Sequence, residues 1–125
     1  MPANPLDAYQ SVENSTLSGR DLEASILIKA ALRLADVQQN WSAPDLDQRL
    51  DEALKFDQRV WTFFQAEVSQ EDNPLPVDVK RNILQLSAFI DRRIFEVMAY
   101  PAPEKLDALI SINRGIAAGL RGDPG

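Results

Sequence analysis

The chain contains no cysteine and no histidine, and these two absences exclude much of the familiar chemistry of proteins. Without cysteine there is no disulfide, no thiol nucleophile and no thiolate ligand for zinc or an iron–sulfur cluster. Without histidine there is no imidazole base, so Ser-His-Asp triads and histidine-based metal helices are excluded as well. The composition therefore favours a protein that binds over one that catalyses a reaction. We expect no enzyme activity, no cofactor and no metal.

Long apolar runs are missing too, because no stretch approaches the ~20 apolar residues that cross a bilayer. The first residues lack the basic region and apolar stretch of a signal peptide. We therefore expect a cytoplasmic protein without membrane insertion. A chain of 125 residues with 45% apolar side chains fits one small domain spanning residues 1–125. Residues 1–4 and 121–125 are expected to be frayed tails of that domain.

Basic side chains are outnumbered, since 13 Lys and Arg against 19 Asp and Glu give a net charge of −6. Residues 1–75 carry 6 basic and 13 acidic side chains, whereas residues 76–125 carry 7 basic and 6 acidic ones. A nucleic-acid-binding protein normally presents a basic patch, because counterion release drives its binding. We therefore expect no direct contact with nucleic acid. An anionic partner would meet the second part of the chain.

The prolines fall between periodic stretches and never inside a long one, which is typical of an all-helical protein. Between them, apolar residues recur at steps of three and four, without sustained strand-like alternation. The pattern predicts a short N-terminal helix and then four long amphipathic helices, over residues 5–13, 19–40, 43–69, 77–98 and 103–120. Short connections between long helices favour an antiparallel bundle, so the predicted fold class is all-α.

Two helices raise questions that the sequence leaves open. The helix over residues 43–69 carries Phe56, Phe63 and Phe64 beside Trp61, so its apolar face is too broad for burial on one side. It either lies centrally in the bundle, exposes a groove for a partner helix, or forms the seam of a homo-oligomer. Asn113 lies on an apolar stripe, where a polar group must find a hydrogen bond. It either fixes register inside the core or contacts the backbone of a partner.

Other chemical motifs are weak. The carboxylate pairs Asp47 and Asp51, and Glu67 and Glu71, lie four residues apart among polar neighbours, as on a solvated helix face. Phosphate-binding loops and nucleophile elbows are absent. An enzyme built on this chain would have to use carboxylates, lysines or tyrosines alone.

The string LDALISINRGIAAGL, residues 106–120, is similar to the closing signature of the flagellar protein FlaF family. Further strings match the same pattern in order, and they are Ala8-Tyr9-Gln10, Ala53-Leu54 with Val60-Trp61, Asn73-Pro74-Leu75-Pro76, and Arg81-Asn82-Ile83-Leu84-Gln85-Leu86. The resemblance covers the chain from about residue 4 to residue 120. Asp57 departs from the pattern, because an asparagine is expected before the tryptophan.

The resemblance implies a small cytoplasmic helical protein of alphaproteobacterial flagellar assembly. Members of this family are regarded as regulators of flagellin synthesis and as partners of flagellin before export, tied functionally to the translational regulator FlbT. The main hypothesis is therefore a flagellin-binding export chaperone that also regulates flagellin synthesis. The alternative is a post-transcriptional regulator of flagellin mRNA that acts with a partner such as FlbT, although the acidic charge disfavours direct RNA binding.

Flagellin has amphipathic helices at its ends, and an apolar groove of the bundle would bind one of them. The side chains expected at that contact are drawn from the third and the last long helix. They are Trp61, Phe64, Leu109, Asn113, Ile116 and Leu120.

Overall fold

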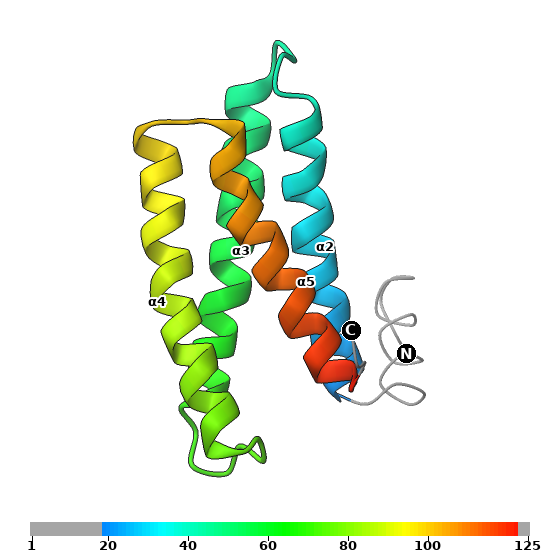
Figure 1. The fold of residues 1–125 in the computed structure, drawn as a ribbon, viewed down its shortest axis with the longest axis vertical. Helices are drawn as coiled ribbons and strands as arrows, with labels where there is room; N and C mark the ends of the chain where they lie inside the picture. The colour runs from blue at the N-terminus through cyan, green and yellow to red at the C-terminus, as the bar shows by residue number, and fades with distance from the viewer. Residues whose placement is uncertain (1–18, 123–125) are drawn as a thin grey trace, which may run out of the picture.

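The computed structural model describes residues 19–122, which form four α-helices and one short 3-10 helix (Figure 1). The elements in chain order are α2 (Gly19–Gln39), α3 (Leu46–Val68), α4 (Val77–Ala99), η1 (Pro103–Leu106) and α5 (Asp107–Arg121). No strand occurs within residues 19–122, so the predicted all-α fold class is confirmed. The short helix expected over residues 5–13 lies outside the described residues.

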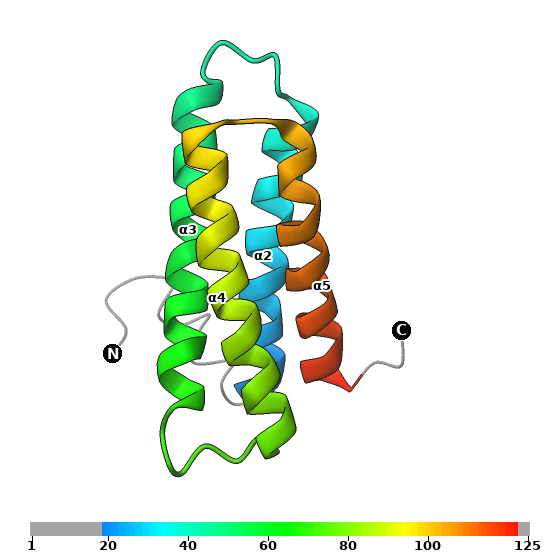
Figure 2. The same cartoon turned by 60° about the vertical axis from the view of Figure 1, so that its left-hand side comes forward.

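The four helices form an antiparallel bundle in which some seams are much tighter than others. Helix α5 packs most extensively along α2, and α3 packs between α2 and α4, whereas α4 and α5 meet at few positions. Figure 2 shows α4 in front of α2, with α3 on one side and α5 on the other. Helices α3 and α5 are therefore diagonal to each other. The bundle has three close seams and one loose seam, between α4 and α5.

Helix α2 presents a different face to the core than its sequence suggests. Of the apolar residues Leu22, Ile26 and Ala30, which lie four apart on one face, only Ala30 is buried, and Ile26 is 36% exposed. The apolar residues of α2 lie on several of its faces, so their periodicity alone does not determine which face is buried. Packing is decided by small side chains that let α5 approach closely. The buried residues of α2 are Ala24, Leu27, Ala30, Ala31, Leu34 and Val37.

Helix α3 packs between α2 and α4 and is thereby buried on two sides. It buries Trp61 and Phe64 against its neighbours. The guanidinium of Arg33 on α2 lies 4.3 Å from the ring centroid of Phe56, and it covers that ring. Phe63 remains 49% exposed. The contacts of α3 with α2 on one side and α4 on the other bury most of its broad apolar face.

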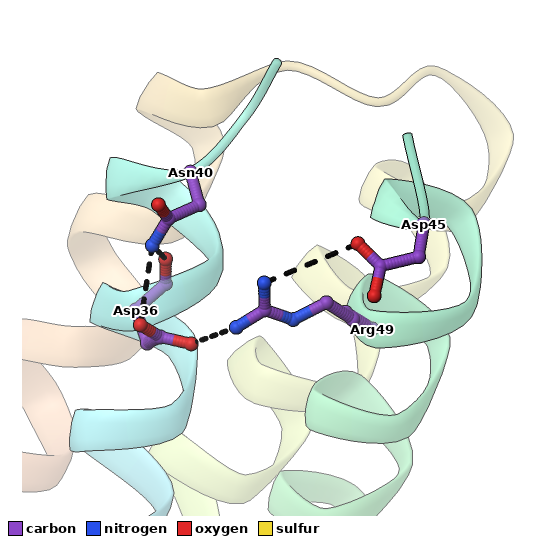
Figure 3. A network of polar contacts seen from close by, with 4 residues as sticks. All are labelled: Asp36, Asn40, Asp45 and Arg49. Carbon is purple, nitrogen blue, oxygen red and sulfur yellow. Dashed lines mark hydrogen bonds and ion pairs between the residues drawn. The ribbon is translucent and has the colours of Figure 1, made fainter. Parts of the chain in front are cut away.

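The helix boundaries follow from local hydrogen bonding. Residues 42–45 form a turn, so α3 begins at Leu46 and not near residue 43. Figure 3 shows the polar contacts that hold this turn: Arg49 pairs with Asp36 and, at 4.0 Å, with Asp45, while Asn40 Nδ2 donates to the carbonyl of Asp36. These side chains are exposed, so each contact contributes little stability. They join the end of α2 to the start of α3.

The last helix begins and ends at residues that its sequence explains. Pro103 starts the single turn of η1, so the α-helical geometry of α5 begins only at Asp107 and not at residue 103. Gly122 ends α5 with φ of 77°, and its N–H donates to the carbonyls of Ala118 and Gly119. Glycine adopts this left-handed conformation without a Cβ clash.

The α2–α5 seam predicts a large difference between two leucines of the same helix. Leu27 is fully buried, whereas Leu32 is 58% exposed. Leu27→Ala should lower the free energy of unfolding by about 2–5 kcal/mol, because it removes buried methyl groups and leaves a cavity. Leu32→Ala should change it by less than about 0.5 kcal/mol. Urea unfolding of both variants tests this, and similar losses in both would contradict the packing described.

Candidate functional site

The loose seam between α4 and α5 opens into a groove with a volume of about 440 Å³. Its walls come from the first half of α4 and the second half of α5, and the loop before α4 closes one end. We call it the α4–α5 groove. Its lining residues are Arg20, Leu75, Pro76, Val79, Asn82, Ile83, Gly115, Ile116, Gly119 and Leu120.

The walls of the groove are mostly apolar and carry no charge, with Asn82 as the polar residue of the α4 wall. Val79 and Ile83 form the α4 wall, and Ile116 and Leu120 form the α5 wall. Arg20 is the one charged lining residue in the described part of the chain, and it forms no salt bridge with another described residue. The groove therefore offers apolar contact along its length and a positive charge at one end.

The loop between α3 and α4 places Leu75 at the end of the groove. The N–H of Leu75 donates to Asn73 Oδ1 at 3.0 Å, and Asn73 Nδ2 donates to the carbonyl of Glu67 at 3.1 Å. Pro74 and Pro76 flank Leu75 and keep the chain extended, because the residue before a proline avoids the helical region. Leu75 is consequently held, partly buried, against the core.

A second cavity of about 320 Å³ adjoins the groove and shares four lining residues with it, Arg20, Leu75, Ile83 and Leu120. Glu23 and Glu67 line it. Burial raises the pKa of Glu23, the neighbouring Glu67 carboxylate raises this pKa further, and Arg20 opposes both effects. This cavity is thus acidic where the α4–α5 groove is not, and it is a poor site for an anion.

Gly115 and Gly119 leave the α5 wall without side chains over one turn. Both lie inside a regular helix, where glycine costs ~1 kcal/mol relative to alanine. A Cβ atom added at either position would have no heavy atom within 4 Å apart from the local helix. Packing among the described residues therefore does not require glycine at either position.

A buried chain of hydrogen bonds crosses the bundle and determines which way α5 faces. Trp61 Nε1–H donates to Asn113 Oδ1 at 2.7 Å, and Asn113 Nδ2–H donates to Asp57 Oδ1 at 2.7 Å. All three side chains are fully buried. Asp57 and Trp61 lie one turn apart on α3, and Asn113 reaches them from the diagonal helix. Asn113 is therefore a buried core residue whose amide group is hydrogen-bonded, as the first of its two interpretations expects.

Asp57 is the member of this network whose burial lowers stability. Its Oδ2 atom is buried and has no hydrogen-bond partner among the described residues. Burial raises the pKa of Asp57 from 3.8 to about 6, although the hydrogen bond from Asn113 acts in the opposite direction. Desolvation exceeds the gain from one hydrogen bond, because a carboxylate loses all its water in the core.

The six side chains expected at a partner contact have different positions in the structure. Ile116 is half-buried and Leu120 is 9% exposed, and both line the groove. The other four belong to the bundle core in this structure, with exposed fractions of 3% or less. They are Trp61, Phe64, Leu109 and Asn113.

Sequence reasoning missed the groove residues that are not large and apolar. Gly115 and Gly119 were the available signal. Glycine is unfavourable inside a helix, and these two lie four residues apart, on the same face of an amphipathic helix. Arg20, Val79 and Asn82 carry no such signal. Only the packing of α4 beside α5 brings them to the same place.

Other classes of site find no support in the described residues. Across residues 19–122, no group of three or more acidic side chains is arranged to hold a metal ion. In the same part of the chain, none of the helices has the length and apolar character needed to cross a membrane.

Comparison with known proteins gives one match. A family model described as flagellar protein FlaF matches residues 5–120. No curated protein and no solved structure matches the chain.

The raised pKa of Asp57 predicts a pH-dependent stability. Protonated Asp57 does not carry the cost of a buried charge. Its contribution to the free energy of unfolding is fully present below pH 3.8 and is lost as the pH rises through about 6. Between pH 4 and pH 7 the natural protein should lose on the order of 3 kcal/mol relative to Asp57→Asn, which cannot ionise. Urea unfolding of both proteins at several pH values gives this difference. The contributions of the other carboxyl groups are the same in both proteins and cancel. A difference that does not vary with pH would contradict the expectation.

Proposed function

This chain belongs to the flagellar protein FlaF family, and on that premise we propose that it is a flagellar assembly factor that binds flagellin as a cytoplasmic export chaperone and regulates flagellin synthesis. The observation that supports the proposal most directly is the α4–α5 groove. It is an apolar surface between two helices that the described residues leave uncovered.

The shape of the groove suits a helix as its ligand. Two roughly side-by-side helices form its walls, and an amphipathic helix laid between them would complete the loose seam. Val79, Ile83 and Ile116 would then bury apolar side chains of the partner. The terminal segments of flagellin are amphipathic helices, so they have the required pattern. Binding them before export would keep their apolar faces from other contacts.

In this proposal the protein acts by binding and not by catalysis. The one carboxyl group with a strongly raised pKa among the described residues, Asp57, is buried in the core and does not line the groove. A general acid or base must reach its substrate, so this carboxyl group is unsuited to the role. The absence of histidine and cysteine supports the same view.

Regulation of flagellin synthesis would pass through a partner protein, for which FlbT is the candidate that the family implies. The net charge of −6 disfavours direct contact with flagellin mRNA. A protein that is occupied by flagellin and one that is free would then present different surfaces to that partner. Flagellin binding and regulation would be linked through the same groove.

Flagellin binding can be measured by titration calorimetry with the folded protein and monomeric flagellin. We expect saturable binding, and we expect Ile116→Glu and Asn82→Glu each to weaken it at least tenfold. Either change places a carboxylate in an uncharged wall of the groove, and desolvating it costs more than the 1.4 kcal/mol that corresponds to tenfold.

Ala88→Glu is the matched control, because Ala88 is exposed on α4 and does not line the groove. It should bind flagellin like the natural protein. Asn82 is exposed, so its substitution should leave the fold intact even if Ile116→Glu reduces stability. Absence of binding by the folded natural protein would refute the proposed chaperone role.

Direct binding to flagellin mRNA, the alternative route of regulation, can be measured separately. The natural protein should not shift flagellin mRNA in a gel at physiological salt, because its acidic surface cannot release counterions from the phosphates. A shift that weakens steeply as salt is raised would instead establish direct RNA binding.

A further inference from the structure

We propose that the α4–α5 groove accepts a helix whose contacting face consists of small residues and which carries a carboxylate at the end that reaches Arg20. This inference rests on the proposed function, because it specifies the kind of flagellin helix that the groove binds. Three observations carry it: the uncharged walls, the two glycines of α5 and the positive end.

The α5 wall is smooth and uncharged. Residues at steps of three and four lie on one helix face, and on this face of α5 no side chain carries a charge. Two of them, Gly115 and Gly119, are exposed, and Ile116 between them is half-buried. The full face comprises Ala108, Ile112, Gly115, Ile116 and Gly119.

The chain itself does not explain the two glycines. Neither has a positive φ, since Gly122 is the only described residue with that backbone conformation. Neither is approached by another part of the described chain, because an added Cβ would meet open space. Together they reduce helix stability by ~2 kcal/mol relative to alanine. A residue that lowers stability without an internal reason is expected where a ligand approaches the backbone.

The approach of a helix is the arrangement that these glycines permit. Helices packed through large side chains keep their axes 8–10 Å apart, and a partner can come nearer where side chains are missing. Gly115 and Gly119 lie one turn apart, so they clear the same strip of surface. A partner uses that strip fully only if its own contacting residues are small. Apolar side chains beside this face would contact Val79 and Ile116.

The positive end of the groove selects the charge of the partner. Arg20 lies there without a salt bridge to a described residue, although its charge also lowers the pKa of Glu23 in the neighbouring cavity. Helix α4 also begins there at Val77, and Pro76 at its N-cap provides no side-chain hydrogen bond to the first N–H groups. Asp78 in the first turn lies 3.9 Å from Arg81, and its side chain is 95% exposed. Uncapped N–H groups and a cation together favour a carboxylate.

The first experiment replaces the glycines in the full chain. Gly115→Ala with Gly119→Ala should raise the urea midpoint of unfolding, because both positions have open space and alanine favours the helix. The same double variant should bind flagellin at least tenfold more weakly, since two methyl groups block close approach. A gain in stability together with a loss of affinity excludes unfolding as the cause.

Thr62→Ala is the control for the general effect of a better helix former. Thr62 is exposed on α3 and lines no part of the groove. Its substitution should raise stability and leave flagellin affinity unchanged. If the glycine double variant binds flagellin as well as the natural protein, the proposed close approach is refuted while flagellin binding itself stands. If the natural protein does not bind flagellin, the proposed function fails first.

The second experiment tests the positive end. Arg20→Glu should weaken flagellin binding about tenfold and make it less sensitive to salt, whereas Arg20→Lys should stay within about threefold of the natural protein. Equal affinity of Arg20→Glu and the natural protein would refute the carboxylate contact.

The third experiment identifies the occupant by photo-crosslinking from Asn82→benzoylphenylalanine, an exposed position in the α4 wall. Crosslinks to a helix of flagellin with small residues on one face support the proposal. Crosslinks in the presence of flagellin to residues 1–18 of this chain, or to a second copy of it, would overturn it. Ala88→benzoylphenylalanine is the control and should give no crosslink to flagellin.

Discussion

Asn113 accepts a hydrogen bond from Trp61 and donates one to Asp57, and it does so across the diagonal of the bundle. Only one rotation of α5 about its axis allows both bonds. Because successive residues turn by about 100° around a helix, fixing Asn113 toward α3 leaves half-buried Ile116 toward α4 and places Gly115 and Gly119 on the exposed side beside it. The α4–α5 groove is thus a consequence of a polar contact that lies inside the core and not at the groove itself.

A purely apolar core would not provide this constraint. Leucines and isoleucines tolerate small rotations and shifts, whereas a buried amide leaves its donors and acceptors unpaired as soon as the helix turns. Asp57 makes the constraint expensive, since Oδ2 is buried without a partner. The asparagine that the family pattern leads one to expect there would accept the same bond from Asn113 without a charge. This chain therefore retains the register of α5 at some loss of stability.

The helices could be predicted from the sequence because prolines and apolar spacing act locally, and the described boundaries differ from the expected ones by a few residues. The rotation of α2 could not, since Ile26, Leu27 and Ile28 are all apolar and only the fit of small alanines against α5 selects the buried face. Asn113 was recognised as anomalous, but its partner Asp57 lies 56 residues away. The groove depends on which seam is loose, and that property belongs to the packed bundle.

A loose seam leaves apolar surface of a small bundle incompletely buried and so lowers its stability. This loss is understandable if the seam binds a partner. The alanines of α2 draw α5 against that helix, and α4 packs on α3, so the surface between α4 and α5 stays incompletely buried. Alanine at 115 and 119 would add helix propensity without a clash, yet both positions are glycine. In a chain with a net charge of −6, the groove also ends at a cation and an uncapped helix N-terminus. The glycines weaken the isolated protein, and together these features are suited to a helix with small residues and a carboxylate that completes the bundle from outside.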